Sequence, residues 1–480
     1  MLHWIDTSII FLFLIGLMGF GWWQSRLNKS TVDFFLGGKT IPWVVAMFSI
    51  VATETSVLTF ISIPGIAYRG NWLFLQLAIG YILGRILVSL FLLPQYFNSG
   101  VTSIYEVLGK KFGPEIQKVA SGVFLITRIL ADGIRYLATA VIVQVVTGWS
   151  LPAAVLVIGG VTLVYSLLGG IRTIVWIDSF QFVLYLTGGL ISIFYILANI
   201  ELSFGDALAQ LSEAGKLQIL NFSGDFIHDP YLFMSAVIGG MFLSFSSHGA
   251  DYMMVQRVLG TKDLESGRKA MIGSGLFVFL QFGIFLLAGS LIYLLFQNLD
   301  LSLIDGKFLN NDLTEIKKDR EFALFIVNNL PIGVKGFLLA GILSAAMSTL
   351  SSSINSLASS TITDWFKGEA DLKKSRIVSG IWAIVLIGIA LVFDEGDSAI
   401  VIMGLTIASF TYGGLLGLFL LSKLDASFHQ TSLILGLISS CLIVFYLKQI
   451  GLAWTWFILV SVFVNVGITM VSERVIRILK

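Results

Sequence analysis

The serine-dense segment 344–356 concentrates the side chains of this chain that could bind an ion. It reads Ser-Ala-Ala-Met-Ser-Thr-Leu-Ser-Ser-Ser-Ile-Asn-Ser, inside a stretch otherwise apolar enough to cross a membrane. Ser348, Ser352 and Ser356 recur every four residues, so a helix would line one of its faces with oxygen. A buried hydroxyl costs about 1–3 kcal/mol unless a partner satisfies it, and neutral oxygens suit an alkali cation that must later be released. This density favours a cation site over hydroxyls that bond back to their own helix, or small residues that allow close helix packing.

Charged side chains in apolar stretches form a second group, because each is costly in a membrane. Asp178 lies near the start of such a stretch and could complete the cation site, or cap or pair near the interface. Arg128, Asp132 and Arg135 share one helix face by their spacing. Asp132 could neutralise one arginine and leave the other for an anionic group, and a structural ion network is an equal alternative. Glu54 could pair with an arginine, bind a substrate amine or hydroxyl, or stay protonated.

The composition predicts an all-α polytopic membrane protein. Of the 480 residues, 56% are hydrophobic and 12% are charged, whereas a soluble chain has about 25% charged residues. Many apolar runs reach the roughly 20 residues that span a bilayer. The net charge of +1 gives no indication of a nucleic-acid partner, and we expect neither nucleic acid nor an obligate protein partner. About thirteen spans are predicted, near 7–24, 42–67, 72–95, 119–147, 150–168, 174–198, 231–257, 270–297, 333–364, 376–393, 398–421, 429–447 and 453–472.

The basic residues orient these spans. Nineteen Lys and Arg residues lie in loops on one side of the membrane, and eight lie in loops on the other side. Arg257 is counted among the nineteen. By the positive-inside rule the N-terminus is external and the C-terminus cytoplasmic. The longest loops, 199–230 and 298–332, are then external and too short for enzymatic domains. Short loops favour a bacterial inner membrane.

Two of the predicted spans are interrupted by polar residues. The first interruption is Ala52-Thr53-Glu54-Thr55-Ser56 in 42–67, and the second is Ser244-Phe245-Ser246-Ser247-His248-Gly249 in 231–257. Backbone at membrane depth leaves the helix only where it lines a cavity or is buried in protein. Two interrupted spans five helices apart are typical of an inverted-repeat secondary transporter. We therefore predict an extra helix in 1–30, a first five-helix repeat in 31–200, a second in 201–425 and two extra helices in 426–480.

Other function classes fit the sequence less well. None of the four histidines has a metal-ligand spacing such as H-E-x-x-H, and no P-loop is present, so we expect neither an enzyme nor an ATP-driven pump. A channel has no need of two broken helices that meet at the midplane. A membrane sensor usually carries a cytoplasmic catalytic domain, and the tail after residue 472 is too short for one.

Five motifs, in order from about residue 30 to 420, resemble those of the sodium/solute symporter (SSS) family. Ile171 and Thr173 depart from the commonest form of the second motif, and Tyr252 replaces a glutamine in the third. The resemblance implies a LeuT-type fold of five plus five inverted helices and alternating access driven by the sodium gradient. The motifs are Asp33-Phe34-Phe35-Leu36-Gly37-Gly38-Lys39, Leu168-Gly169-Gly170-Ile171-Arg172 with Asp178, Asp251-Tyr252-Met253-Met254-Val255-Gln256-Arg257, the serine segment ending Asn355-Ser356, and Tyr412-Gly413-Gly414-Leu415-Leu416-Gly417.

The resemblance also implies where two sodium ions bind. The family's principal sodium site uses backbone carbonyls of the first core helix and hydroxyls of the eighth. Some members, notably the sialic acid transporters, have a second site with an aspartate and eighth-helix serines. Carried over to this chain, the first site falls on the carbonyls of Ala52, Thr55 and Ala345 and the hydroxyls of Ser348 and Thr349, and the second on Asp178, Ser348, Ser351 and Ser352.

The solute is expected to carry a carboxylate. A glucose-like sugar is disfavoured because span 270–297 has no lysine after Ala270 and Thr59 replaces the first-helix glutamine. Resemblance to the sialic acid carriers places Ser56, Thr59, Gln76 and Arg135 around the solute, with Phe245 closing over it. Glu54 departs from that pattern, and together with Arg135 it would suit a zwitterion. We therefore expect the solute to be sialic acid or another carboxylated compound. An amino acid is the second candidate, and a neutral sugar or polyol is the third.

Overall fold

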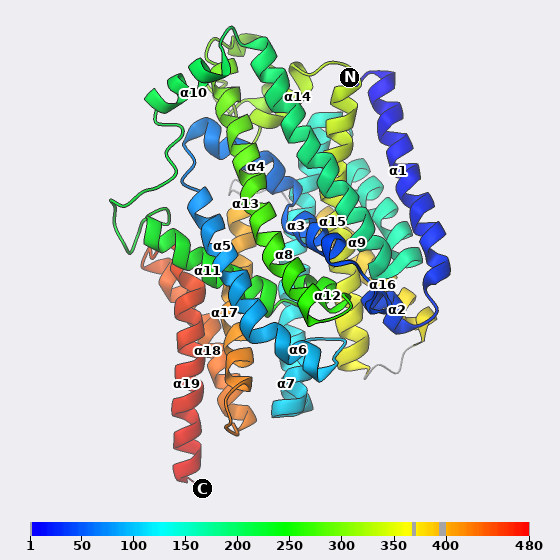
Figure 1. The fold of residues 1–480 in the computed structure, drawn as a ribbon, viewed down its shortest axis with the longest axis vertical. Helices are drawn as coiled ribbons and strands as arrows, with labels where there is room; N and C mark the ends of the chain where they lie inside the picture. Colours follow the sequence, from blue (N-terminus) through cyan, green and yellow to red (C-terminus); the bar gives the residue numbers. More distant parts are fainter. Residues whose placement is uncertain (1, 367–370, 393–399, 480) are drawn as a thin grey trace.

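The protein is described by a computed structural model that covers residues 2–366, 371–392 and 400–479. Within these ranges the regular structure is helical apart from two isolated bridges, which confirms the all-α prediction (Figure 1). The helices are α1 (Trp4–Gln24), α2 (Thr31–Leu36), α3 (Trp43–Glu54), α4 (Val57–Arg69), α5 (Leu75–Leu87), α6 (Leu93–Ser99), α7 (Tyr105–Phe112), α8 (Pro114–Thr147), α9 (Leu151–Asn199), α10 (Phe204–Glu213), α11 (Phe233–Gly249), α12 (Tyr252–Leu259), α13 (Leu264–Leu295), α14 (Glu321–Asn328), α15 (Val334–Ser360), α16 (Leu372–Val392), α17 (Ile400–Ser422), α18 (Gln430–Gln449) and α19 (Phe457–Leu479). Short 3-10 or π turns are η1 (Ser25–Leu27), η2 (Gly37–Lys39), η3 (Val88–Leu92), η4 (Leu301–Leu303), η5 (Gly306–Phe308), η6 (Thr361–Trp365) and η7 (Trp454–Trp456).

The apolar helices agree with most of the predicted spans. Among the described residues, nine helices are long and apolar enough to cross a membrane, and α3 with α4 makes a tenth span bent by 62°. Three more spans are needed to reach the predicted thirteen. Helix α9 would have to hold two spans, α11 and α12 together would have to form one, and α17 would have to form another. The count of thirteen therefore stays a prediction. Residues 393, 398 and 399, at the ends of two predicted spans, lie outside the described residues.

Helix α9 contains both spans predicted in 150–168 and 174–198. Its 49 residues would extend roughly 70 Å as one straight helix, more than twice the roughly 30 Å of a hydrocarbon core. The non-helical Gly170, at φ 60° and ψ −165°, divides it. Residues on both sides of Gly170 reach the same part of α15: the Tyr165 hydroxyl donates to the Met347 carbonyl at 3.1 Å, and Asp178 shares the partner Thr53 with Ser352. The chain therefore turns back at Gly170.

Both predicted interruptions exist, and the second lies further along the chain than expected. Helix α3 ends at Glu54 and α4 begins at Val57, within the predicted polar run. In the second span, 244–249 stays helical and the break falls at Ala250 and Asp251. The prediction of its position was wrong because polarity alone does not end a helix. The side chain of Asp251 accepts from Met253 N at 2.9 Å and begins a new helix there.

Helix α15, which carries the serine segment, lies at the centre of the molecule. Its side chains from Leu338 to Ser360 are buried, and it packs against α1, α3, α8, α9, α12 and α16. Small Ser, Ala and Gly side chains let neighbouring helices approach it closely. The predicted oxygen-lined face is therefore enclosed by protein.

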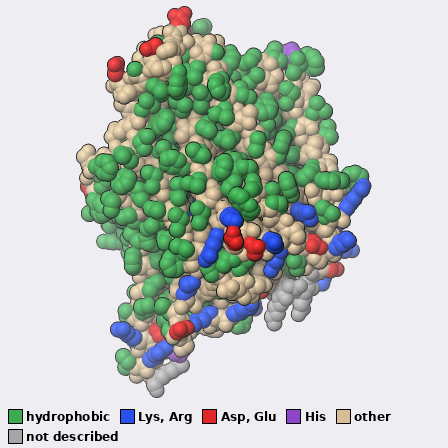
Figure 2. Space-filling model, in the orientation of Figure 1, with side chains coloured by type: hydrophobic (Ala, Val, Ile, Leu, Met, Phe, Trp, Pro, Cys, Tyr) green, Lys and Arg blue, Asp and Glu red, His purple; other side chains and the backbone are tan. Residues whose placement is uncertain are grey.

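The charges are unevenly distributed between the two ends of the molecule. The termini lie at opposite ends of the view in Figure 1. On the face drawn in Figure 2, Lys and Arg side chains gather towards the end where the C-terminus lies. Arg257, counted with the loop residues in the sequence analysis, is completely buried in α12. That part of the count was wrong because α12 is short, folds back into the core and does not extend into a loop.

Candidate functional site

The break between α3 and α4 exposes backbone carbonyls to the core. In a continued helix the amide of Ser56 would bond to Ala52 O, but it donates to Glu54 O at 3.1 Å. Helix α4 starts its own ladder with the bond from Phe60 N to Ser56 O at 3.0 Å, so Thr55 O precedes it. The carbonyl end of a helix carries partial negative charge. The break thus offers oxygen to a cation where the sequence predicts the first sodium site.

Many hydroxyls of α15 donate to carbonyls of their own helix. This is the arrangement expected of serines that bind no ion. Ser352 Oγ donates to Ser348 O at 2.6 Å, Ser353 Oγ to Thr349 O at 3.0 Å, and Thr349 Oγ1 to Ala345 O at 3.5 Å. Such a bond uses the hydroxyl hydrogen and leaves the oxygen lone pairs free. Back-bonding therefore satisfies the helix and still presents oxygen to a neighbour.

The residues predicted for the first sodium site are buried on helices that pack against one another. Ala52, Thr55 and Ala345 are buried, and α15 packs against both α3 and α4. Thr349 lines a small hollow together with Ser56. Ser348 Oγ is buried and has no hydrogen-bond partner among the described residues. Thr55 Oγ1 donates to Gln281 Oε1 at 3.1 Å, which fixes the break against α13.

Asp178 lies between α3, α12 and α15. Its Oδ2 accepts from Ser49 Oγ at 2.8 Å, from Thr53 Oγ1 at 3.3 Å and from Arg257 Nη2 at 3.3 Å. Arg257 Nη2 also donates to Ser352 Oγ. Two of the residues predicted for the second sodium site, Asp178 and Ser352, thus already contact a guanidinium cation. Ser351 Oγ of the same set donates to Ser348 O at 3.0 Å.

A cavity of about 150 Å³ lies beside the two breaks. Glu54 at its edge pairs with Arg85, whose Nη1 donates to Ser274 Oγ at 2.6 Å. His248 Nε2 lies 3.7 Å from Glu54 Oε2 and has no hydrogen-bond partner in the described part of the chain. The lining is Glu54, Ser56, Thr59, Ser62, Ile63, Ile66, Phe74, Tyr81, Arg128, Arg135, Leu243, Ser244, Ser247, His248, Met254, Phe282 and Tyr412.

The two arginines of this lining have different surroundings. Arg128 is buried and bonds to Asp251, Tyr412 and Asp132, the last at 3.2 Å. Arg135 keeps 20% of its side chain exposed and lies 3.4 Å from Asp132 Oδ1. Asp132 also accepts from Ser353 Oγ at 2.5 Å, so its charge is shared. Arg135 is therefore the cation that the cavity can offer to an anion.

Two residues predicted to contact the solute lie elsewhere. Gln76 is fully buried, and its amide bonds to Leu73 O, Tyr231 O and Asn221 N at 3.1, 2.9 and 3.1 Å. It fixes an outer loop and is not among the described residues that line the cavity. Phe245 is buried where α11 crosses α5 and also does not belong to that lining. Phe74 and Phe282, with ring centroids 5.3 Å apart, supply aromatic rings to the cavity.

Sequence reasoning missed several functional candidates. His248 was noted only within a predicted break, and Arg257 only within a motif and among the basic loop residues, although each is a polar side chain in an apolar run. That signal could have placed both in the core. Tyr412 and Phe282 gave no such signal, because aromatic residues are common in membrane helices.

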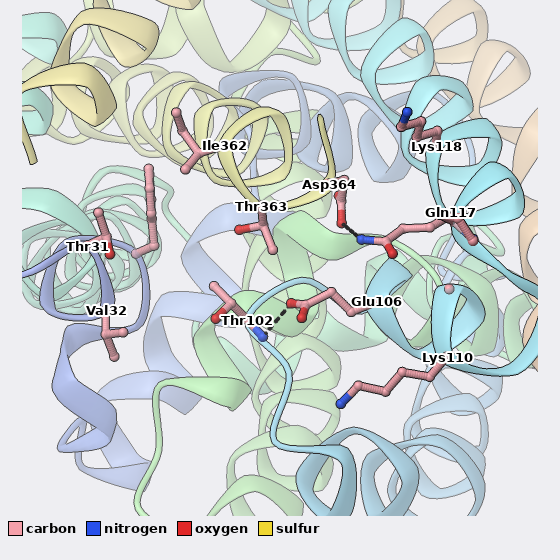
Figure 3. A pocket seen from close by; sticks show the side chains of 13 residues that line it. Thr31, Val32, Thr102, Glu106, Lys110, Gln117, Lys118, Ile362, Thr363 and Asp364 are labelled. Carbon is pink, nitrogen blue, oxygen red and sulfur yellow. Dashed lines mark hydrogen bonds between the residues drawn. The ribbon is translucent and has the colours of Figure 1, made fainter. Parts of the chain in front are cut away.

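A second cavity, of about 520 Å³, opens between α2, α7, α8 and η6. Asp364 closes its inner end and accepts from Gln117 Nε2 at 2.9 Å, as Figure 3 shows, and from Ser103 and Ser360. Glu106 Oε1 accepts from the amide of Thr102 at 2.8 Å. These bonds fasten the end of α15 to α7 and α8. Both carboxylates of this lining are thus bonded within the protein, and its remaining charges are Lys110, which donates to Ser99 O at 2.7 Å, and Lys118.

The family model, the curated relatives and a solved structure all match this chain over most of its length. The model of the Sodium:solute symporter family matches residues 34–423. The human sodium/iodide cotransporter is 27% identical over 90% of this chain and 68% of its own length. The sodium/sialic acid symporter NanT of Aliivibrio fischeri is 26% identical over 93% of this chain and 88% of its own. A solved structure of a Na⁺-coupled sialic acid symporter in a substrate-bound outward-open state superposes with a TM-score of 0.86 at 23% identity, covering 98% of both chains. The match confirms the expected LeuT-type fold.

Proposed function

Because this chain belongs to the sodium:solute symporter family, we propose that it carries a small carboxylated organic solute, of the sialic acid class, into the cell together with sodium. The observation that carries this proposal is the position of Arg135. It lines the cavity beside the first break and has a weakly held, shared counter-ion. A carboxylate can therefore bind it without first displacing a strong partner.

The rest of the cavity suits the polar remainder of such a solute. Ser56, Thr59 and Ser62 bring hydroxyls to the lining, and His248 adds a ring nitrogen, Nε2, that has no hydrogen-bond partner among the described residues. Phe74 and Phe282 provide flat apolar surfaces. A few placed polar groups in an otherwise apolar pocket are the usual design of a small-molecule site.

The anionic character of the solute also draws support from the relatives. Iodide and sialic acid, named for two of them, are both anions. In this chain Glu54 is neutralised by Arg85, so it does not repel a carboxylate. A zwitterionic amino acid would need a free carboxylate to bind its ammonium group, and Glu54 is not free in this pair. The pair therefore favours carboxylated solutes over amino acids.

We propose two sodium positions for this chain. The first lies at the carbonyls of Ala52, Thr55 and Ala345 with the hydroxyls of Ser348 and Thr349, where the ion would tie the broken helix to α15. The second lies at Asp178 with Ser348, Ser351 and Ser352. Each ion would hold α15 against the helices that carry the break, and coupling requires that sodium and solute raise each other's affinity by the same factor.

The orientation and repeat boundaries complete the proposal. The basic end of the molecule would face the cytoplasm of a bacterial inner membrane, with the N-terminus outside. Residues 31–200 and 201–425 would form the two repeats, each opening with a broken helix. Their relative rocking would expose the cavity to either side in turn.

Thermal unfolding of the purified protein tests the proposal. The midpoint is measured in NaCl and in KCl, with sialic acid, small monocarboxylates, amino acids or neutral sugars. A ligand that binds the folded state raises the midpoint by mass action, and we expect a rise from sialic acid in sodium only. Arg135→Gln should abolish that rise, whereas Arg268→Gln, which removes a charge bonded to Ser89 O far from the cavity, should keep it. A midpoint indifferent to sodium would contradict the symporter, and a sodium-dependent rise with neutral sugars alone would contradict the carboxylated solute.

A further inference from the structure

We propose that Arg257 is a built-in competitor of sodium at the position formed by Asp178 and Ser352, an inference that rests on the sodium coupling proposed above. The guanidinium of Arg257 would balance the charge of Asp178 while sodium is absent. Sodium would then enter only as Arg257 gives up its bonds there. This role makes an arginine of α12 a determinant of sodium affinity.

The contacts of Arg257 support this role, because its guanidinium uses the oxygens that an ion would use. Nε donates to Ser49 Oγ at 2.9 Å and Nη1 to Met253 O at 2.5 Å. Nη2 donates to Asp178 Oδ2 at 3.3 Å and also to Ser352 Oγ. The arginine therefore satisfies one carboxylate oxygen and one hydroxyl oxygen of the second sodium position.

Burial makes the competition strong. Arg257, Asp178 and Ser352 are all 0% exposed. Arg257 and Asp178 together are electrically neutral, so an added sodium ion would leave a net positive charge in the core. An uncompensated buried charge costs several kcal/mol. The carboxylate thus cannot fully neutralise the ion and the guanidinium at the same time.

Two oxygens at this position are not used by Arg257. Asp178 Oδ1 and Ser348 Oγ are buried, and within the described ranges neither has a hydrogen-bond partner outside this pair of residues. Ser348 lies beside Asp178. A buried polar atom without a partner carries a desolvation cost that a cation would relieve. Sodium would bind these two oxygens first. It would then replace the guanidinium as the partner of Ser352 Oγ.

Helix α12 is held to its neighbours by a residue other than Arg257. The neighbouring residue, Gln256, donates from Nε2 to Phe35 O at 2.9 Å and to Asn355 Oδ1 at 2.8 Å. These bonds join α12 to α2 and α15. Arg257 would therefore give up its bonds to Asp178 and Ser352 on a helix that Gln256 keeps in place.

A sodium titration of the thermal midpoint tests the inference in the full-length protein. Arg257→Gln should lower the half-saturating sodium concentration about tenfold or more, because a unit charge is removed within about 4 Å of the ion in a protein interior. Arg257→Lys, which keeps the charge, should stay within about twofold of the wild type. Arg268→Gln is the control for the loss of one positive charge elsewhere.

The outcomes separate this inference from the proposed function. An unchanged or higher half-saturating concentration in Arg257→Gln would overturn the role of Arg257, as would an equal effect of Arg257→Lys. If Arg257→Gln does not fold, Ser49→Ala serves instead; it removes one anchor of the guanidinium and should lower the half-saturating concentration, and no decrease would overturn the inference. A wild type that ignores sodium would contradict the proposed function itself.

Discussion

At the scale of single residues, most of the buried charges in and around the cavity are neutralised by an ion pair. Arg85 balances Glu54, Asp251 balances Arg128, and Arg257 balances Asp178. Asp132 is divided between Arg128 and Arg135. Since buried ion pairs gain little over apolar packing but are expensive to break, these pairs position helices and leave Arg135 as the residue that we propose binds the solute.

Glu54→Gln is expected to destabilise the protein by about 3 kcal/mol, because the buried Arg85 loses its counter-ion. Glu54→Gln combined with Arg85→Met should recover most of that loss, since neither charge then remains. The measurement is thermal unfolding in KCl. Asp319→Asn is the control: its pair with the partly exposed Arg69 should contribute about 1 kcal/mol or less. A Glu54→Gln protein as stable as the wild type would mean that Arg85 is balanced by another group.

At the scale of the elements, two breaks and one turn position the site. Glycines at the crossing of α5 and α11 allow the backbones to touch, since a Cβ on Gly84 would lie 2.4 Å from Met241 O. This crossing holds the second broken span, α11 and α12, beside the cavity. The break itself depends on Asp251, which both caps α12 and pairs with Arg128.

Asp251→Asn and Asp251→Ala separate these two tasks. Asparagine keeps the capping oxygen but loses the charge, and alanine loses both. We expect both variants to be destabilised by about 3 kcal/mol, because the buried Arg128 keeps only the carboxylate of Asp132, which it shares with Arg135, with alanine about 1 kcal/mol worse through the lost cap. Thermal unfolding of the two variants measures the difference. Equal stabilities would show that the cap contributes nothing.

Gly170→Ala is expected to disrupt the turn in α9. The backbone there lies in a region that is essentially restricted to glycine, and a Cβ would lie 2.6 Å from Phe34 O. We expect a loss of about 2 kcal/mol or more, read from the thermal midpoint. Gly160→Ala on the same helix meets nothing within 4 Å and should stabilise slightly. If both variants behaved alike, the turn at Gly170 would not depend on its conformation.

At the scale of the whole molecule, the arrangement is a central serine helix that packs against α1, α8, α9 and α16 and against parts of the two broken spans. Helix α15 is buried along nearly its whole length, while α1, α16, α18 and α19 cover the outside with exposed apolar side chains. Exposed apolar surface is what lipid favours. The asymmetry of Lys and Arg between the ends then sets the proposed orientation.

Cysteine labelling in intact cells tests that orientation. The chain has one cysteine, Cys441, so Cys441→Ser provides a background without thiols. We expect Ser223→Cys, exposed in the loop before α11, to react with an impermeant reagent added outside. Asp425→Cys, exposed between α17 and α18, should react only after the cells are opened. The reverse pattern would invert the proposed topology.

The sequence alone determined the class, the family, most of the apolar spans and the first interruption. Apolar length and polar breaks are local properties, so 42–67 and α3 with α4 agree within a few residues. It also placed Asp178 and the serine segment among the candidates for one site. The position of the second break was not readable, because 244–249 is polar but remains helical.

Only the tertiary structure decided which charges meet. Arg257 was counted with the loops, yet α12 folds inward and brings it to Asp178, 79 residues away along the chain. Gln76, a candidate for the solute, is held by the backbone of residues 221 and 231, and Phe245 is enclosed at a helix crossing. The cost of burying a charge requires that it find a partner, but the partner's identity depends on how distant helices pack. That packing makes Arg135 the available cation of the cavity and brings Arg257 to Asp178 and Ser352, where we propose the second sodium position.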